Sequence, residues 1–169
     1  MNIILTMLNY LGYISTVVVL ITVILAVITW IRGIAPAIIR LGNGLAKRKI
    51  AIFAKSDTLS SLTSLLIDSG LFLEKNITII TKEDDFGKSE ESTLFLVYWP
   101  DWKDKIIKIA NRKKDSEALV IYSPKSAGPI PEDVIAELDK GRNVALVNFR
   151  GRLLNDIVTA MITTGYTKK

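Results

Sequence analysis

The sequence predicts an α/β protein in two parts, a single N-terminal transmembrane helix and a following domain built on a five-stranded parallel sheet. Two observations lead to this prediction. The first 31 residues contain no charged side chain, which is the composition of a membrane span. After residue 49, short apolar runs alternate with segments of helical periodicity, which is the pattern of a parallel sheet covered on both faces.

The apolar N-terminal run is long enough to cross a bilayer. About 20 apolar residues suffice at about 1.5 Å rise per residue, and a lone span must be helical to satisfy its own backbone, so we place the helix at roughly residues 8–32. A cleaved secretory signal is the alternative, and Ala35-Pro36-Ala37 resembles a cleavage site. Such a signal carries a basic residue before a shorter apolar core, so we favour a retained anchor.

The charges around the span predict its orientation. The basic side chains nearest to it all follow it in the sequence: Arg32, Arg40, Lys47, Arg48 and Lys49. By the positive-inside rule, the N-terminus lies outside and the body of the protein lies in the cytoplasm. We therefore expect a transmembrane helix over residues 1–32, a juxtamembrane linker over 33–48 and a cytosolic domain over 49–169.

One face of the predicted span carries mostly small or weakly polar residues at alternating spacings of three and four. Its members are Gly12, Ser15, Val19, Thr22, Ala26, Thr29 and Gly33. Small residues let helices approach closely in a membrane, and hydroxyls can bond across the interface. This face predicts a homo-oligomeric bundle in which rings of Ser and Thr line a narrow path. The alternative is a lone span with these residues at no particular angle.

The linker joins the span to the domain. Pro36 breaks a straight continuation of the helix, and Gly42-Asn43-Gly44 forms a turn or joint. Between them, Ile38, Ile39 and Leu41 with flanking arginines predict a short amphipathic segment at the headgroup surface. A solvated linker with a basic end is the alternative.

The domain alternates strands and helices. We predict strands at residues 50–54, 77–81, 93–98, 118–122 and 144–148, and helices at 58–69, 102–111, 131–140 and 153–164. Asp101 is the predicted cap of the second helix, and Pro131 the first residue of the third. The polar residues 82–92 read as a mobile loop. Right-handed crossovers then favour the flavodoxin-like strand order 2-1-3-4-5, a Rossmann-like arrangement.

Composition excludes several chemistries. The chain has no Cys and no His, which excludes thiol nucleophiles, Cys/His zinc sites and histidine acid-base catalysis, while carboxylate or lysine chemistry survives. Lys55-Ser56-Asp57-Thr58 after the first strand matches neither a dinucleotide fingerprint nor a P-loop. We expect no catalytic residues, no metal and no cofactor. The net charge of +5 is compatible with an anionic lipid or an anionic ligand.

Cationic, hydroxyl and aromatic side chains follow four of the strands. Ligands bind outside the carboxyl ends of the strands in such sheets, phosphates pair with cations and helix-start amides, and bases stack on rings. The candidate ligand-binding residues are Lys55, Ser56, Trp99, Lys125, Ser126, Arg150 and Arg152. Each also has a simpler explanation, as a solvated charge, a helix cap or a packing residue. Their coincidence at one edge predicts a site for a nucleotide-like anion.

The combination of a short membrane span with a Rossmann-like domain resembles the membrane effectors of bacterial antiviral defence systems. This resemblance lies in the architecture of the whole chain and in no specific motif. It implies a homo-oligomer in the bacterial inner membrane, a nucleotide or short oligonucleotide ligand, a ligand-synthesising enzyme encoded nearby, and a pore that opens to arrest the infected cell. It does not imply an enzyme.

Two other functions fit the same sequence. A membrane-tethered adaptor would use the α/β domain to bind a protein partner. A tethered enzyme would use carboxylate chemistry, although Glu132 and Asp133 are ordinary first-turn acids of a helix.

Overall fold

A computed structural model describes residues 2–36, 42 and 48–164 of the chain. The chain divides into two compact units, residues 1–42 and 43–169, which are described separately. In the predicted linker, Ile38, Ile39, Leu41 and Asn43-Gly44 lie outside the described residues.

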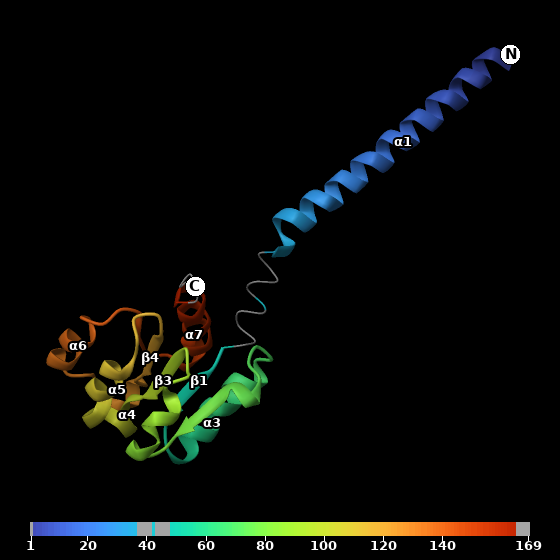
Figure 1. The fold of residues 1–169 in the computed structure, drawn as a ribbon. Coiled ribbons are helices and arrows are strands. Elements are labelled where there is room, and N and C mark those ends of the chain that lie inside the picture. Colours follow the sequence, from blue (N-terminus) through green and yellow to red (C-terminus); the bar gives the residue numbers. More distant parts are fainter. Residues whose placement is uncertain (1, 37–41, 43–47, 165–169) are drawn as a thin grey trace. The chain divides into compact units, whose positions relative to one another are not determined.

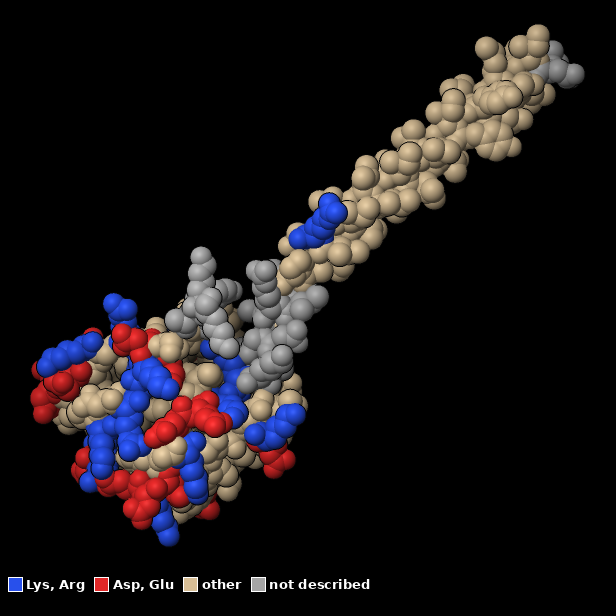
Figure 2. Space-filling view, in the orientation of Figure 1, with Lys and Arg blue, Asp and Glu red and all other residues tan. Residues whose placement is uncertain are grey.

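The first unit is the helix α1, Asn2–Gly33. It begins earlier than the predicted residue 8, and its 32 residues give a length of about 48 Å, more than the hydrocarbon core requires. Residues 3–33 have the length and hydropathy of a membrane span. Figure 2 shows the helix surface without charge except near its end, where the last turn carries Arg32. Apolar side chains face outward on all sides, a surface suited to lipid.

The second unit is an α/β domain whose sheet has the predicted order β2-β1-β3-β4-β5 with every pairing parallel. Its strands are β1 (Ile50–Phe53), β2 (Ile77–Ile80), β3 (Leu94–Tyr98), β4 (Ala118–Tyr122) and β5 (Val144–Val147). The three central strands are apolar and almost fully buried, whereas the edge strands β2 and β5 are partly exposed. The structure therefore confirms the predicted fold class.

Helices cover both faces of the sheet (Figure 1). On one face, α3 (Ser56–Asp68) and α7 (Arg150–Thr164) pack their buried leucines and isoleucines on Ile50, Ile52 and Leu96. On the other, α4 (Trp99–Trp102), α5 (Ile106–Arg112) and α6 (Glu132–Leu138) pack on β1, β3 and β4. Side chains of a strand alternate between these two cores because the strand has period two.

Three local predictions need correction. The predicted helix 102–111 is divided into α4, the 3-10 turn η3 (Lys103–Lys105) and α5, because Trp102 leaves helical geometry at φ −130° and ψ 14°. Contrary to the prediction, Asp101 does not cap the helix that follows it. It lies within α4, and its carboxylate accepts a hydrogen bond from the Lys55 N–H. Pro131 precedes α6 as its cap instead of opening it.

The predicted loop 82–92 is also more ordered than its composition indicates. It contains the 3-10 segment η2 (Glu83–Ser89), in which the Phe86 ring is buried. That ring packs against Phe53 and Trp102, with ring centroids 5.6 Å and 5.4 Å away respectively. One buried aromatic residue anchors this polar segment. The segment has no apolar periodicity, so its sequence predicts a loop.

Candidate functional site

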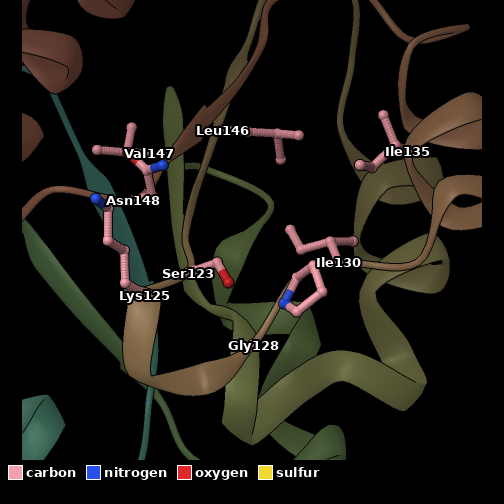
Figure 3. Close-up of a pocket in the computed structure, with 9 residues that line it drawn as sticks. Ser123, Lys125, Gly128, Ile130, Ile135, Leu146, Val147 and Asn148 are labelled. Atoms are coloured by element: carbon pink, nitrogen blue, oxygen red, sulfur yellow. The ribbon is translucent and has the colours of Figure 1, made fainter.

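A hollow of the domain lies at the carboxyl ends of β4 and β5. Its volume is about 540 Å³, within the range of small-molecule sites. Its walls come from the ends of both strands, the segment between β4 and α6, and α6 itself (Figure 3). The lining residues are Ser123, Lys125, Gly128, Pro129, Ile130, Ile135, Leu146, Val147 and Asn148.

The pocket has a polar side and an apolar side. Figure 3 shows Lys125 extending toward the end of β5 beside Asn148, while Leu146, Ile130 and Ile135 lie across from them. Ser123 lies between the two sides and is only 8% exposed. Its backbone N–H donates to the Val147 carbonyl at 2.8 Å, which fixes the ends of the two strands together.

Local chain geometry places Lys125 at this edge. Residues Lys125–Ala127 form the 3-10 turn η4, and Gly128 leaves it at φ 79°, a left-handed conformation that glycine adopts without strain. The Lys125 ammonium lies over the Phe149 ring, 4.5 Å from its centroid. Because the ring face is electronegative, it holds the cation at the rim of the pocket.

The start of α3 is arranged differently. Here the Asp101 carboxylate accepts the Lys55 N–H at 2.7 Å, and the Lys55 ammonium lies 5.1 Å from the centroid of the Trp102 ring. Ser56 begins the helix at φ 48°. This place, between β1 and β3, is the switch point of the sheet, where ligands of such folds bind. A carboxylate of the chain itself occupies the position that an anion would take there.

The remaining predicted ligand residues lie away from the pocket. Trp99 is 6% exposed and belongs to the core beneath α4 and α5, so packing accounts for it. Arg150 and Arg152 belong to the first turns of α7 and not to a loop. The Arg150 guanidinium donates to the Ser61 carbonyl at 3.0 Å, and that of Arg152 lies 3.8 Å from the Asp156 carboxylate.

The seven candidates therefore separate into four places: the start of α3, the core position of Trp99 in α4, the turn η4, and the start of α7. Of the seven, Lys125 alone lines the pocket, and Ser126 beside it is exposed. The apolar wall of Ile130, Ile135 and Leu146 was not predicted. The sequence signals only Leu146 of this wall, as an apolar residue on a predicted edge strand. In the structure, the Leu146 side chain remains 43% exposed.

On α1, the hydroxyls of the predicted oligomer face bond within their own helix. Ser15 donates to the Gly12 carbonyl, and Thr22 and Thr29 donate to the carbonyls of Val18 and Leu25. These bonds satisfy the hydroxyls in an apolar medium without a partner helix. The pairing of Gly12, Ser15, Val19, Thr22, Ala26, Thr29 and Gly33 with a second copy stays a prediction.

Within the described residues, no group of three or more acidic side chains is placed to hold a metal ion. The chain thus joins an apolar N-terminal helix to a flavodoxin-like domain with a pocket at the carboxyl edge of its sheet. Comparison with protein-family models, curated proteins and solved structures gives no significant match.

Proposed function

We propose that the protein is a membrane-anchored effector of bacterial antiviral defence. Its α/β domain binds a nucleotide or short oligonucleotide, and this binding controls a homo-oligomeric pore formed by α1. The domain lies in the cytoplasm, where such a ligand is made. The tethered-enzyme alternative has less support, because no acidic side chain lines the pocket.

The observation that supports ligand binding is the pocket at the carboxyl ends of β4 and β5. Open parallel sheets bind ligands at this edge. The pocket combines an apolar wall that suits a base with a lysine that suits a phosphate. Support for the membrane part comes from the length and apolar surface of α1.

Calorimetry tests the proposal. It measures the binding of ribonucleoside 5′-phosphates and short oligoribonucleotides to the full chain in lipid nanodiscs. We expect Lys125→Ala to weaken binding at least tenfold, because it removes the one cation among the described residues of the pocket wall. Lys103→Ala is the matched control, since Lys103 is an exposed lysine that follows α4 outside the pocket.

Growth of bacteria that overexpress each variant gives the second readout. Lys125→Ala should change the growth arrest that the native chain causes, reducing it if the ligand opens the pore and increasing it if the ligand restrains it. If no ligand of either kind binds, or if all variants bind equally, the proposal is wrong.

The adaptor remains the second candidate, and one observation favours it. Ile79 lies on the edge strand β2 and is exposed, as are Leu71 and Leu73 in the segment before that strand. Exposed apolar side chains beside an open strand edge are typical of protein-binding surfaces. Replacing Ile79 with Lys would abolish partner capture in the adaptor and leave nucleotide binding unchanged.

A further inference from the structure

The pocket at the ends of β4 and β5 offers few groups to an anion. Lys125 is the one charged side chain among its nine lining residues, and Ser123 and Asn148 are the two others with polar side chains. A ligand with several phosphates would therefore find one cation, and its other charges would stay in solvent, where they gain little.

The backbone of the same segment is also engaged. The N–H of Ser123 donates to Val147, that of Ala127 to Pro124 at 2.8 Å, and that of Gly128 to Lys125 at 3.3 Å. Sites that cradle several phosphates present a series of unpaired amides to them. At these three positions the amides already have acceptors within the chain, so they are not offered to a phosphate.

The other cations predicted for this edge have partners elsewhere. Arg150 bonds to the Ser61 carbonyl of α3, on the opposite face of the sheet from α6. Arg152 lies near Asp156, and Lys55 is above Trp102 with its own N–H bonded to Asp101.

The opposite wall is apolar. Ile130 is buried, and Ile135 and Leu146 complete a surface that has no polar side chain (Figure 3). Burial of an apolar body on that wall contributes binding in proportion to the area removed from water. The Phe149 ring holds the Lys125 ammonium at the other side, so charge and apolar surface lie at opposite sides of one cavity.

From this distribution we infer that the pocket binds one small amphipathic molecule with a single anionic group. The anionic group pairs with Lys125, and Ser123 and Asn148 donate hydrogen bonds to it. The flat apolar body lies on Ile130, Ile135 and Leu146. The inference rests on the proposed function and narrows it to recognition of one anionic group, so that the further phosphates of a polyphosphate or an oligonucleotide add no affinity.

The test compares five probes with the full chain in nanodiscs: adenosine 5′-monophosphate, adenosine, adenosine triphosphate, phenyl phosphate and inorganic phosphate. We expect the monophosphate to bind at least tenfold more tightly than adenosine, a difference of about 1.4 kcal/mol. The triphosphate should bind within threefold of the monophosphate. Inorganic phosphate should bind at least tenfold more weakly than phenyl phosphate, because it has no apolar body.

Variants separate the two sides of the pocket. Lys125→Ala should reduce the affinity for the monophosphate to that for adenosine, whereas Lys125→Arg should retain most of it. Leu146→Ser should reduce the affinities for the monophosphate and for adenosine by the same factor. Lys103→Ala should change none of these affinities.

The outcomes distinguish this inference from the function on which it rests. If adenosine triphosphate binds at least tenfold more tightly than the monophosphate, the single-anion inference is wrong and nucleotide sensing stands. If phenyl phosphate binds through Lys125 while no nucleotide does, the inference stands and nucleotide sensing is wrong. Failure of all five probes to bind overturns both.

Discussion

The contact between Lys55 and Asp101 permits a sharp test of which part of the sheet edge binds a ligand. Asp101→Ala removes the acceptor of the Lys55 N–H, whose distance of 2.7 Å is that of a charge-assisted hydrogen bond. Such bonds contribute about 1.5 to 3 kcal/mol when well shielded. Lys55 is exposed and Asp101 is half-buried, so we expect a loss of about 1 to 2 kcal/mol in the free energy of unfolding.

For a domain of this size, that loss lowers the melting temperature by roughly 3 to 8 °C. Circular dichroism of the detergent-solubilised chain measures it. Asp101→Asn, which keeps an acceptor oxygen, should lose less than half as much. Nucleotide affinity should stay within twofold of the native value in both variants, because the pocket lies at β4 and β5.

The opposite result would refute the assignment of the site. If Asp101→Ala leaves the melting temperature unchanged but removes or strongly alters nucleotide binding, the ligand binds at the start of α3. Lys125 would then be a solvated lysine. Asp104→Ala is the control, since Asp104 is an exposed acid three residues further along the same segment.

Three further predictions concern self-association of the apolar helix α1, its orientation and a surface carboxylate. Protease added to intact spheroplasts should spare the C-terminal domain, since the basic residues follow the span. Leu in place of Ala26 and Gly33 should weaken crosslinking of the oligomer in detergent, because large side chains hold helices apart. Hydrogen bonds from Lys108 first, and then from Lys105, lower the pKa of Glu83. Its contribution to stability should therefore be complete above the ordinary glutamate pKa of about 4.3 and be lost as pH falls through the lowered value.

Each of these has a contradicting result. Digestion of the domain in intact spheroplasts would show that the predicted topology is wrong and that the domain lies outside. Crosslinking that survives the Ala26 and Gly33 changes but fails with Ile24→Phe would place the interface on the other face. Lys108→Ala should raise the pKa of Glu83 in an NMR titration, and an unchanged pKa would show that the ion pair does not form in solution.

The order of the strands could be predicted because it depends on local composition and on the handedness of crossovers. Five apolar runs and the helices between them admit few arrangements, and the observed order is the expected one. The 3-10 segment around Phe86 could not be predicted, because a single aromatic residue decides its packing and leaves no periodic pattern in the sequence.

The candidate site was harder to predict for a related reason. The sequence indicates which residues follow each strand, and Lys125 does reach the pocket. It does not indicate where long side chains go. Arg150 turns back to the Ser61 carbonyl, and Asp101 crosses to Lys55, because each finds a partner on a segment distant in the sequence. The apolar wall depends likewise on how far α6 covers β5, which is a tertiary property.

Helix α7 connects the pocket to the beginning of the domain. It starts two residues after Asn148, which lines the pocket, and its buried side chains Leu153 and Ile157 fix it to the sheet. At its other end, the Thr164 hydroxyl accepts a hydrogen bond from the Arg48 guanidinium at 3.3 Å. Arg48 follows the linker from α1, so a shift of α7 on ligand binding would reach the chain segment that leads to α1.

This connection predicts a variant that binds ligand but does not respond to it. Thr164→Val keeps the size of the side chain and removes the acceptor of the Arg48 hydrogen bond. We expect nucleotide affinity to stay within twofold, while the change in oligomer crosslinking caused by the ligand is lost, because coupling requires contacts that differ between the two states. Thr163→Val is the matched control, since the exposed Thr163 hydroxyl bonds to carbonyls of its own helix. An unaltered ligand response in Thr164→Val, or an equal loss in both variants, would show that the signal does not pass through the end of α7.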